Sequence, residues 1–282
     1  MSEEFRMADF KEYKAYLRSE ENINSCKPYD QLCQKFASLL EQYGDAYEKL
    51  YSEAEAMEYR KEYAKGGEVM HLGYYSPSAS DLFVGGCSRG RLLKRTPKGN
   101  NYDYEYSFDE AGRMICCKKY WINSKGEFAL YSAELFVYEA DRVLSLGYWL
   151  AFKGGGNNLT SIAEYKYKDG KLIRYERASC DLWRKRMATA DEKGVLRQKH
   201  RDYISCSEIS IETFEYENDL LKTVYWYHYT PSVKILDEHR YTFSRDEEGY
   251  LTTYVSEDLS SWARKLHRDE PGTYSVSGKR RR

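Results

Sequence analysis

The sequence predicts a mainly β protein, an antiparallel up-and-down meander of repeated hairpins with an α-helical segment at its N-terminus. Two observations carry this prediction. The first 65 or so residues place apolar side chains at helical spacing, whereas from residue 102 onward apolar and polar residues alternate with the two-residue period of strands. A strand–turn–strand phrase also recurs in that second part. These observations fit either a large open sheet or a barrel.

Residues 1–65 are predicted to be helical and to pack on the sheet. Residues 9–17 are amphipathic, and Lys27-Pro28-Tyr29-Asp30 is typical of a helix start. An apolar stripe follows, within which Gly44-Asp45 predicts a kink or a break. The stripe comprises Leu32, Phe36, Leu39, Tyr43, Tyr47, Leu50, Ala54 and Met57. Packing on the sheet is favoured over a self-associating coiled coil, because the register of the stripe drifts.

Residues 66–101 read as a connector rich in Gly and Pro, with one short strand at 81–84. Its run Gly85-Gly86-Cys87-Ser88-Arg89-Gly90-Arg91 lacks the Gly-Lys-Ser/Thr ending of a phosphate-binding loop. At the other end of the chain, residues 266–282 finish in Lys279-Arg280-Arg281-Arg282 and are predicted to be a disordered basic tail.

Residues 102–265 are predicted to form the repeated β-hairpin body. The turn residue before each returning strand falls at positions 112, 141, 170, 219 and 249, so the separations are 29, 29, 49 and 30. The long interval contains a charged run, residues 184–201, which is predicted to be an inserted loop or short helix. Strands of about ten residues would give roughly nine to eleven of them.

Two of these phrases resemble the YD repeat of RHS and teneurin-type proteins. They are Tyr106-Ser107-Phe108-Asp109-Glu110-Ala111-Gly112-Arg113-Met114 and residues 165–172. The resemblance covers at most residues 102–255. In that family the repeats are structural and enclose or present a partner, so the resemblance implies a scaffold rather than a catalyst. This chain departs from the family in having few units, a longer period and no toxin core.

Composition and charge limit the function classes. The 44 basic and 45 acidic residues nearly balance, which argues against a field that gathers nucleic acid. The N-terminus lacks the features of a secretion signal, and no apolar run is long enough to span a bilayer, so a cytoplasmic protein without membrane contact is expected. The seven cysteines show no zinc-type spacing and no disulfide framework, and neither a metal nor a cofactor is predicted.

Candidate catalytic groups are sparse. His228 and His239 flank the turn at Pro231 and are expected to sit opposite one another, but no third ligand accompanies them. Carboxylates in strands could converge as a glycosidase-like pair, although an outward face of alternating Glu and Lys is the favoured interpretation. These carboxylates are Glu164, Glu212, Glu215 and Glu238. No catalytic residue is predicted.

The sequence therefore favours a non-catalytic protein-binding module or scaffold, with an immunity or accessory protein of a bacterial toxin system as one form of it. Its partner contacts are predicted among large aromatic and basic side chains. These are Tyr148, Trp149, Trp226, Tyr227, Arg184 and Arg186. One alternative is a nucleic-acid-binding protein that uses aromatic strands and the basic run 184–201, and another is an enzyme with a carboxylate or His site inside the sheet.

Overall fold

The computed structural model describes residues 11–67, 90–150, 158–180, 206–247, 251–260 and 272–275. Residues 11–17 are helical, and helices α2 (Glu20–Tyr43) and α3 (Tyr47–Met57) follow. The strands are β1 (Arg60–Lys65), β2 (Arg91–Leu92), β3 (Tyr104–Phe108), β4 (Met114–Ile122), β5 (Phe128–Tyr138), β6 (Val143–Trp149), β7 (Asn158–Lys168), β8 (Lys171–Cys180), β9 (Cys206–Glu217), β10 (Leu220–Thr230), β11 (Ile235–Arg245), β12 (Leu251–Asp258) and β13 (Gly272–Ser275).

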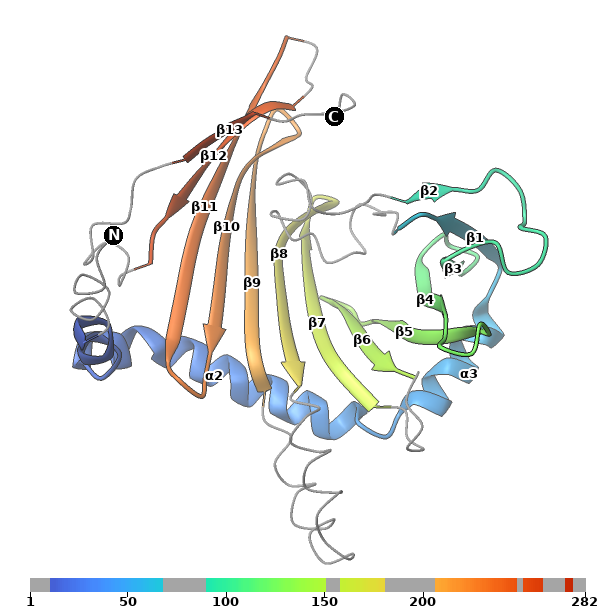
Figure 1. Cartoon of the computed structure of the whole chain (residues 1–282), viewed down its shortest axis with the longest axis horizontal. Coiled ribbons are helices and arrows are strands. Elements are labelled where there is room, and N and C mark those ends of the chain that lie inside the picture. The colour runs from blue at the N-terminus through green and yellow to red at the C-terminus, as the bar shows by residue number, and fades with distance from the viewer. Residues whose placement is uncertain are drawn as a thin grey trace, which may run out of the picture.

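All thirteen strands belong to one antiparallel sheet, in the order β13 to β3 followed by β1 and β2. From β3 to β13 every strand pairs with its neighbour in the chain, so the predicted meander is confirmed. The sheet is open, because β13 and β2 lie at its two edges. It is also strongly curved: Figure 1 shows β9 to β12 along their length and β3 almost end-on. The body predicted at residues 102–265 contributes ten of these strands.

The hairpin turns fall where the repeat predicts them. Gly112 and Gly170 have φ of +79° and +76°, a conformation that Gly adopts without steric cost. Asn218 and Asp219 also have positive φ, and Asx residues tolerate this region better than other side chains. The turn chemistry therefore fixes the period of the meander. The turn predicted at 249 lies outside the described residues.

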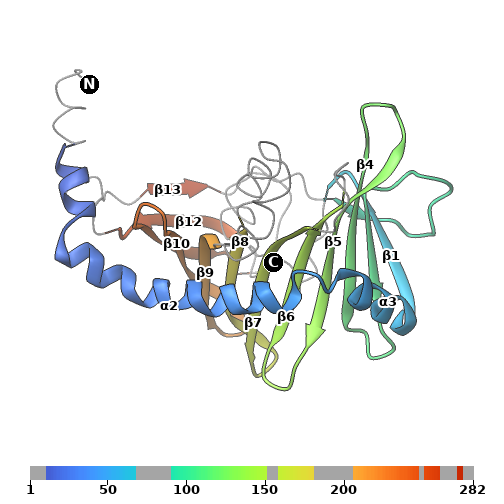
Figure 2. The same cartoon turned by 90° about the horizontal axis from the view of Figure 1, so that it is seen from below.

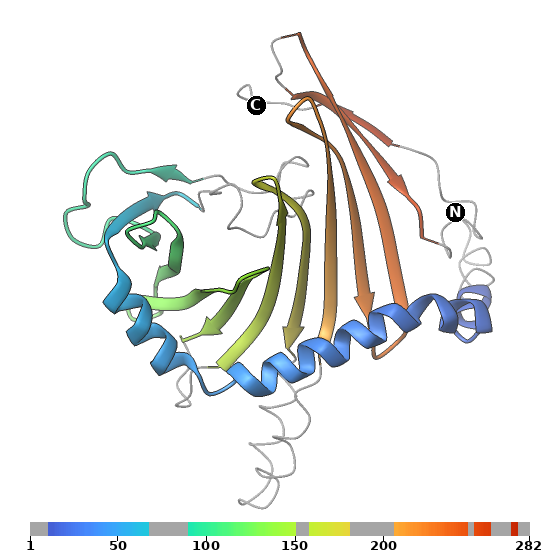
Figure 3. The same cartoon turned by 180° about the vertical axis from the view of Figure 1, so that it is seen from behind.

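Helices α2 and α3 lie in succession across one face of the sheet (Figure 2 and Figure 3). The predicted apolar stripe makes this contact: Phe36, Leu39 and Tyr47 are buried in one cluster with strand residues such as Ile162 and Ile209. The chain breaks between the helices at Gly44, as predicted, and a Cβ there would lie 2.9 Å from the Leu40 carbonyl oxygen. We call this side of the sheet the helix face.

The other side, here the opposite face, carries its own buried cluster. Successive side chains of a strand point to opposite faces of the sheet. Tyr165 pairs with Tyr175 on the opposite face, and the residues before and after each of them point toward the helices. Tyr106, Phe214 and Phe243 belong to the same cluster. Cys116 belongs to the cluster on the helix face and Cys117 to the cluster on the opposite face, as expected for adjacent residues of a strand. Free thiols are carried by Cys26, Cys33, Cys116, Cys117 and Cys206.

The start of α2 differs from the prediction. The helix begins at Glu20 after the N-cap Ser19, whose hydroxyl accepts the Asn22 N–H at 3.2 Å, and Pro28 lies inside the helix. Asn22 is 1% exposed and donates from Nδ2 to the Lys234 carbonyl at 2.9 Å. This anchor to the β10–β11 turn stabilises helical turns ahead of the proline, so a contact distant in sequence moves the helix start upstream of the one predicted at Pro28.

The predicted boundaries also need correction at three strands. Strand β1 lies within the segment predicted to be helical, because Arg60–Lys65 pairs with β3 from Arg60↔Phe108 to Ala64↔Tyr104. Strand β2 lies in the predicted connector and β13 in the predicted tail. The strand predicted at 81–84 and the insertion at 184–201 lie outside the described residues.

A group of charges joins α2 to the helix face. Lys35 Nζ lies 2.8 Å from Glu164 Oε2 and 2.9 Å from Glu176 Oε2, and the two carboxylate side chains are only 3% and 4% exposed. Arg142 and Arg174 make further ion pairs with them. Burial alone would raise the pKa of Glu164, but the hydrogen bond and charge of Lys35 leave that pKa below its ordinary value.

Over the described part of the chain, no helix combines the length and apolar character that crossing a bilayer requires.

Candidate functional site

A polar hollow lies on the opposite face of the sheet, over strands β3 to β8. It has a volume of about 270 Å³ and is here called the polar pocket. Its lining residues are Tyr104, Cys117, Lys119, Ser132, Ala133, Glu134, Gly147, Tyr148, Thr160, Ser161, Tyr175 and Arg177. A concave site with a few convergent polar groups among aromatic rings is the usual form of a ligand-binding site.

Small residues form the floor of the polar pocket. The ladder places Glu134, Gly147, Ser161 and Ser179 side by side across β5 to β8. A Cβ on Gly147 would lie 2.5 Å from Ser161 Oγ, so a side chain at position 147 does not fit without a local shift. The Thr160 hydroxyl donates to the Gly147 carbonyl at 3.0 Å and fixes the backbone beside the floor.

Charged side chains reach over this floor from both sides. Glu134 lies on β5 and Arg177 on β8, three interstrand spacings apart, and Arg177 is two residues along the strand from the row of Glu134. Because Gly147 and Ser161 are small, both long side chains line the same hollow. Burial raises the pKa of Glu134, while a hydrogen bond with Ser145 and the charge of Arg177 act in the other direction. Glu134 is thus held closer to its neutral form than an exposed glutamate.

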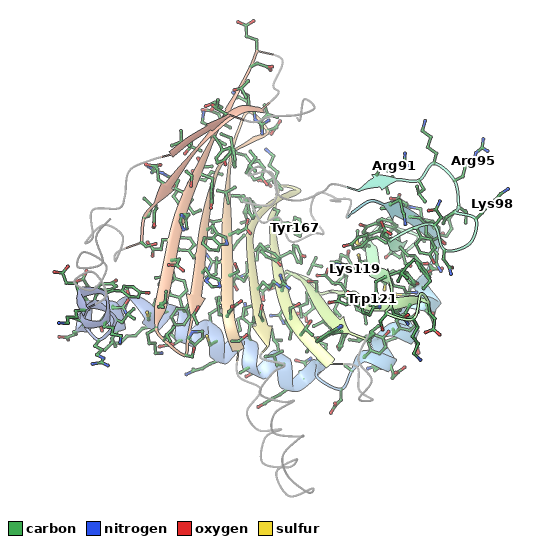
Figure 4. All side chains as sticks on the ribbon, in the orientation of Figure 1. Arg91, Arg95, Lys98, Lys119, Trp121 and Tyr167 are labelled. Atoms are coloured by element: carbon green, nitrogen blue, oxygen red, sulfur yellow. The ribbon has the colours of Figure 1, made fainter. Side chains whose placement is uncertain are left out.

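A cluster of aromatic rings adjoins the polar pocket through Lys119, which lines the pocket, and we call this cluster the aromatic rim. The Tyr131 ring lies 5.4 Å from the Trp121 ring and 6.1 Å from the Trp149 ring. Lys119 Nζ lies over the Tyr131 ring at 5.4 Å and over the Tyr104 ring at 5.7 Å. Lys119 and Trp121 both project from β4 (Figure 4). Trp121 is 41% exposed, which leaves part of its ring for contact with another molecule.

A second hollow lies between α2 and the helix face, with a volume of about 630 Å³; we call it the helix groove. Its lining includes Tyr29 and Leu32 from α2 and Ile211 and Tyr227 from the sheet. The basic groups at its border are already engaged, because Lys35 and Arg174 both pair with Glu176. The helix groove therefore offers mainly apolar contacts.

The residues predicted as partner contacts do not form one surface. Tyr148 is fully buried: its hydroxyl donates to the Tyr43 carbonyl at 2.9 Å and its ring lies 5.1 Å from Tyr47, so a role as a surface anchor is wrong. Trp149 lies in the aromatic rim and Tyr227 in the helix groove on the other side of the sheet.

Trp226 lies on the opposite face, stacked on His228 with ring centroids 5.5 Å apart. Arg184 and Arg186 lie outside the described residues.

The expected histidine pair is displaced by two residues. His228 faces Asp237 across the ladder, and His239 faces Trp226. The β10–β11 turn includes Lys234 at φ +56°, which shifts the register from the one the sequence indicates. A hydrogen bond with Asp237, with help from the charge of Glu208, raises the pKa of His228 despite its burial. Among the described residues no group of three His, Cys, Asp or Glu side chains could hold a metal ion.

The four strand carboxylates do not converge either. Glu164 and Glu238 lie on the helix face, where Glu164 pairs with Lys35 and Glu238 lines the helix groove. Glu212 lies opposite Trp226 on the other side of the sheet, and Glu215 is exposed. A glycosidase-like pair made from these residues is therefore wrong.

Sequence reasoning missed the residues that define the polar pocket. Lys119, Glu134 and Arg177 each occupy a strand position that the alternation assigns to the same face as buried tyrosines. The available signal was the small residues between them: Gly147 and Ser161 stand in strand interiors, where Val or Ile would normally stabilise the sheet.

Comparisons with known proteins give no family for this chain. No family model matches the sequence, and no curated protein matches it. A crystal structure of a protein of unknown function from Bacteroides fragilis NCTC 9343 is similar over 45% of this chain and 81% of its own, with 12% identity and a TM-score of 0.31. A porin-like protein from Bacteroides uniformis ATCC 8492 is similar over 63% of this chain and 89% of its own, with 10% identity and a TM-score of 0.19.

Proposed function

We propose that this chain is a non-catalytic binding protein that receives a protein partner at the polar pocket and its aromatic rim. The observation that carries the proposal is a hollow of about 270 Å³ floored by Gly147 and Ser161, with a partly exposed tryptophan beside it. A hollow of this size accommodates one side chain of a partner, while Trp121 supplies a large and rigid contact next to it.

The chemistry of the site supports binding rather than catalysis. Glu134 is the pocket's carboxyl group, and it lies with cationic Lys119 and Arg177 instead of beside a second carboxylate or a histidine. Mechanisms that use a pair of carboxylates, or a nucleophile activated by a histidine, would need such a neighbour. Hydroxyl groups and fixed charges over a rigid floor suit recognition of a polar group.

The proposal is tested by affinity capture from the source cell lysate, with and without nuclease, read by mass spectrometry. The bait is the tagged chain in three forms: wild type, Trp121→Ser and Ile122→Ser. Ile122 is the matched control, because it is 68% exposed and adjacent to Trp121, yet points to the other face of β4.

A protein captured stoichiometrically by the wild type and by Ile122→Ser, but lost at least ten-fold from Trp121→Ser, supports the proposal. Capture that is equal for all three baits, or capture that disappears with nuclease, overturns it. Circular dichroism and thermal melts of the three baits establish that the difference arises from the surface and not from unfolding.

A further inference from the structure

The polar pocket carries an excess of positive charge. Among the described residues that line it, two are cationic, Lys119 and Arg177, and one is acidic, Glu134. Burial favours the neutral form of Glu134, as the direction of its pKa shift indicates. The hydroxyl of Ser132 is a potential hydrogen-bond donor in the same lining. The pocket therefore offers cations and donors to whatever enters it.

A basic loop extends the same charge beyond the pocket. Residues 90–102 contain Arg91, Lys94, Arg95 and Lys98 and no acidic residue. All four side chains are exposed, and none makes an ion pair within the described part of the chain. Figure 4 shows Arg91, Arg95 and Lys98 at this loop, in the same half of the view as Lys119.

The ladder connects this loop to the pocket. Leu92 pairs with Ala64, Ala64 with Tyr104, and Tyr104 with Lys119, so one row of residues runs from β2 to β4. Three interstrand spacings separate Leu92 from Lys119, or about 14 Å. An extended segment of about four or five residues spans that distance at roughly 3.3 Å per residue.

We propose that the polar pocket binds an oxyanion group on an acidic protein segment, a Glu or Asp carboxylate or a phosphorylated side chain, and that the basic loop attracts the rest of that segment. This inference rests on the proposed function and adds the chemistry of the partner. Arg177 supplies a guanidinium that matches carboxylate and phosphate geometry, and Lys119 supplies a point charge held against two tyrosine rings.

An acidic peptide fits these observations better than a nucleic acid. The hollow accommodates one side chain, and the row between the loop and the pocket is formed by Leu92, Ala64 and Tyr104 rather than by a continuous line of cations. Nucleic acids need several regularly spaced phosphate contacts for affinity. The nearly balanced charge of the whole chain supports the same choice.

The test measures binding of fluorescein-labelled, end-capped octapeptides to the full chain by fluorescence anisotropy, at about 20 mM and at physiological ionic strength. The probes are oligo-glutamate, oligo-glutamine, a glutamine octapeptide with one central phosphoserine, and an eight-nucleotide oligo-dT. The protein variants are Arg177→Met, the double variant Arg95→Gln/Lys98→Gln, and the control Lys125→Gln, which removes one exposed charge from the β4–β5 turn, outside the pocket lining and the basic loop.

We expect oligo-glutamate or the phosphoserine peptide to bind, and oligo-glutamine not to bind. Whichever of the two acidic probes binds more tightly shows whether the pocket prefers a carboxylate or a phosphate. Arg177→Met should weaken binding at least ten-fold at both salt concentrations. The loop variant should weaken binding about three- to ten-fold at low salt and less at high salt, because exposed charges are screened. Lys125→Gln should bind like the wild type.

Equal binding of oligo-glutamine, no binding of either acidic probe, or unchanged binding by folded Arg177→Met overturns the inference. Tighter binding of oligo-dT than of both acidic peptides also overturns it and assigns the surface to nucleic acid. If a lysate partner depends on Trp121 while no acidic probe binds or competes, the proposed function stands and this inference alone fails.

Discussion

Replacing Lys35 with methionine should destabilise the protein far more than removing an ordinary surface lysine. Lys35 Nζ is within 2.9 Å of both Glu164 and Glu176, whose side chains are almost inaccessible to water. Methionine keeps the length and apolar stem of the lysine, and it packs well in a helix. The substitution therefore removes the charge and leaves two carboxylates facing each other across β7 and β8.

The magnitude follows from burial. Breaking a buried ion pair by removing one partner costs about 3–5 kcal/mol, because the remaining charge is left without compensation. Lys35 itself is 32% exposed, and Arg142, Lys166 and Arg174 still pair with the two carboxylates, so the cost is reduced. We expect a loss of about 2–3 kcal/mol in the free energy of unfolding at pH 7.

The dependence on pH gives a second, independent check. The pKa values of Glu164 and Glu176 lie below the ordinary 4.5 in the folded chain, since Lys35 and its neighbours more than offset burial. Stability from such a depressed carboxyl pKa is present above the unfolded value and is lost as the pH falls through the folded value. The difference between wild type and Lys35→Met should therefore shrink as the pH falls below 4.5.

Urea denaturation followed by circular dichroism measures both quantities. The matched control is Lys49→Met on α3, whose ion pair with Glu53 is exposed and long at 3.8 Å, and whose loss should cost less than about 0.5 kcal/mol. Adding Glu176→Gln to Lys35→Met should recover part of the loss. A cost for Lys35→Met no larger than that of the control, or one that is unchanged at low pH, would refute the reasoning.

Three shorter predictions follow. Gly147→Ala should weaken ligand binding and cost about 1–3 kcal/mol, because its Cβ would clash with Ser161 Oγ, and adding Ser161→Gly should restore stability in a thermal melt. The free energy of unfolding of the wild type, measured by urea titration, should fall as the pH rises above 4.5, because the folded chain holds the Glu134 proton more tightly than the unfolded chain. Glu134→Gln removes that proton and should make this fall smaller. Cys33 should react with iodoacetamide before buried Cys116 in mass-spectrometric mapping. A hydrogen bond with Cys206 lowers the pKa of Cys33, whereas burial raises the pKa of Cys116. Equal reaction rates of the two thiols would contradict this prediction.

The fold was predictable where local chemistry decides it. The turns at 112, 170 and 219 carry Gly or Asp in left-handed backbone, so the sequence marks each hairpin directly. The start of α2 was not predictable, because Asn22 is fixed by the Lys234 carbonyl, 212 residues away. Strand β1 was missed for a similar reason: its partner β3 begins about forty residues later, and six residues of Arg, Lys, Glu, Tyr and Ala indicate helix as well as strand.

The candidate site was less predictable than the fold, because it depends on register. Glu134 and Arg177 are 43 residues apart in sequence, and their charges meet only because four strands pair without a slip that would reverse a face. The same sensitivity explains the error for His228 and His239. A displacement of two residues keeps both on one face but replaces His239 by Asp237 as the partner of His228.

The two faces of the sheet also differ in what their polar residues do, and this difference bears on function. On the helix face, Lys35, Glu164 and Glu176 neutralise one another and fix α2 to the strands. On the opposite face, Gly147 occupies a strand interior, where glycine is intrinsically less favourable than alanine by about 0.5–1 kcal/mol, but Ser161 Oγ leaves no room for a Cβ. A larger apolar residue in its place, with a small one at 161, would fill the hollow and bury more surface. The arrangement of small residues beneath Lys119, Glu134 and Arg177 thus gives up stability to keep a charged hollow open, as expected of a surface that binds.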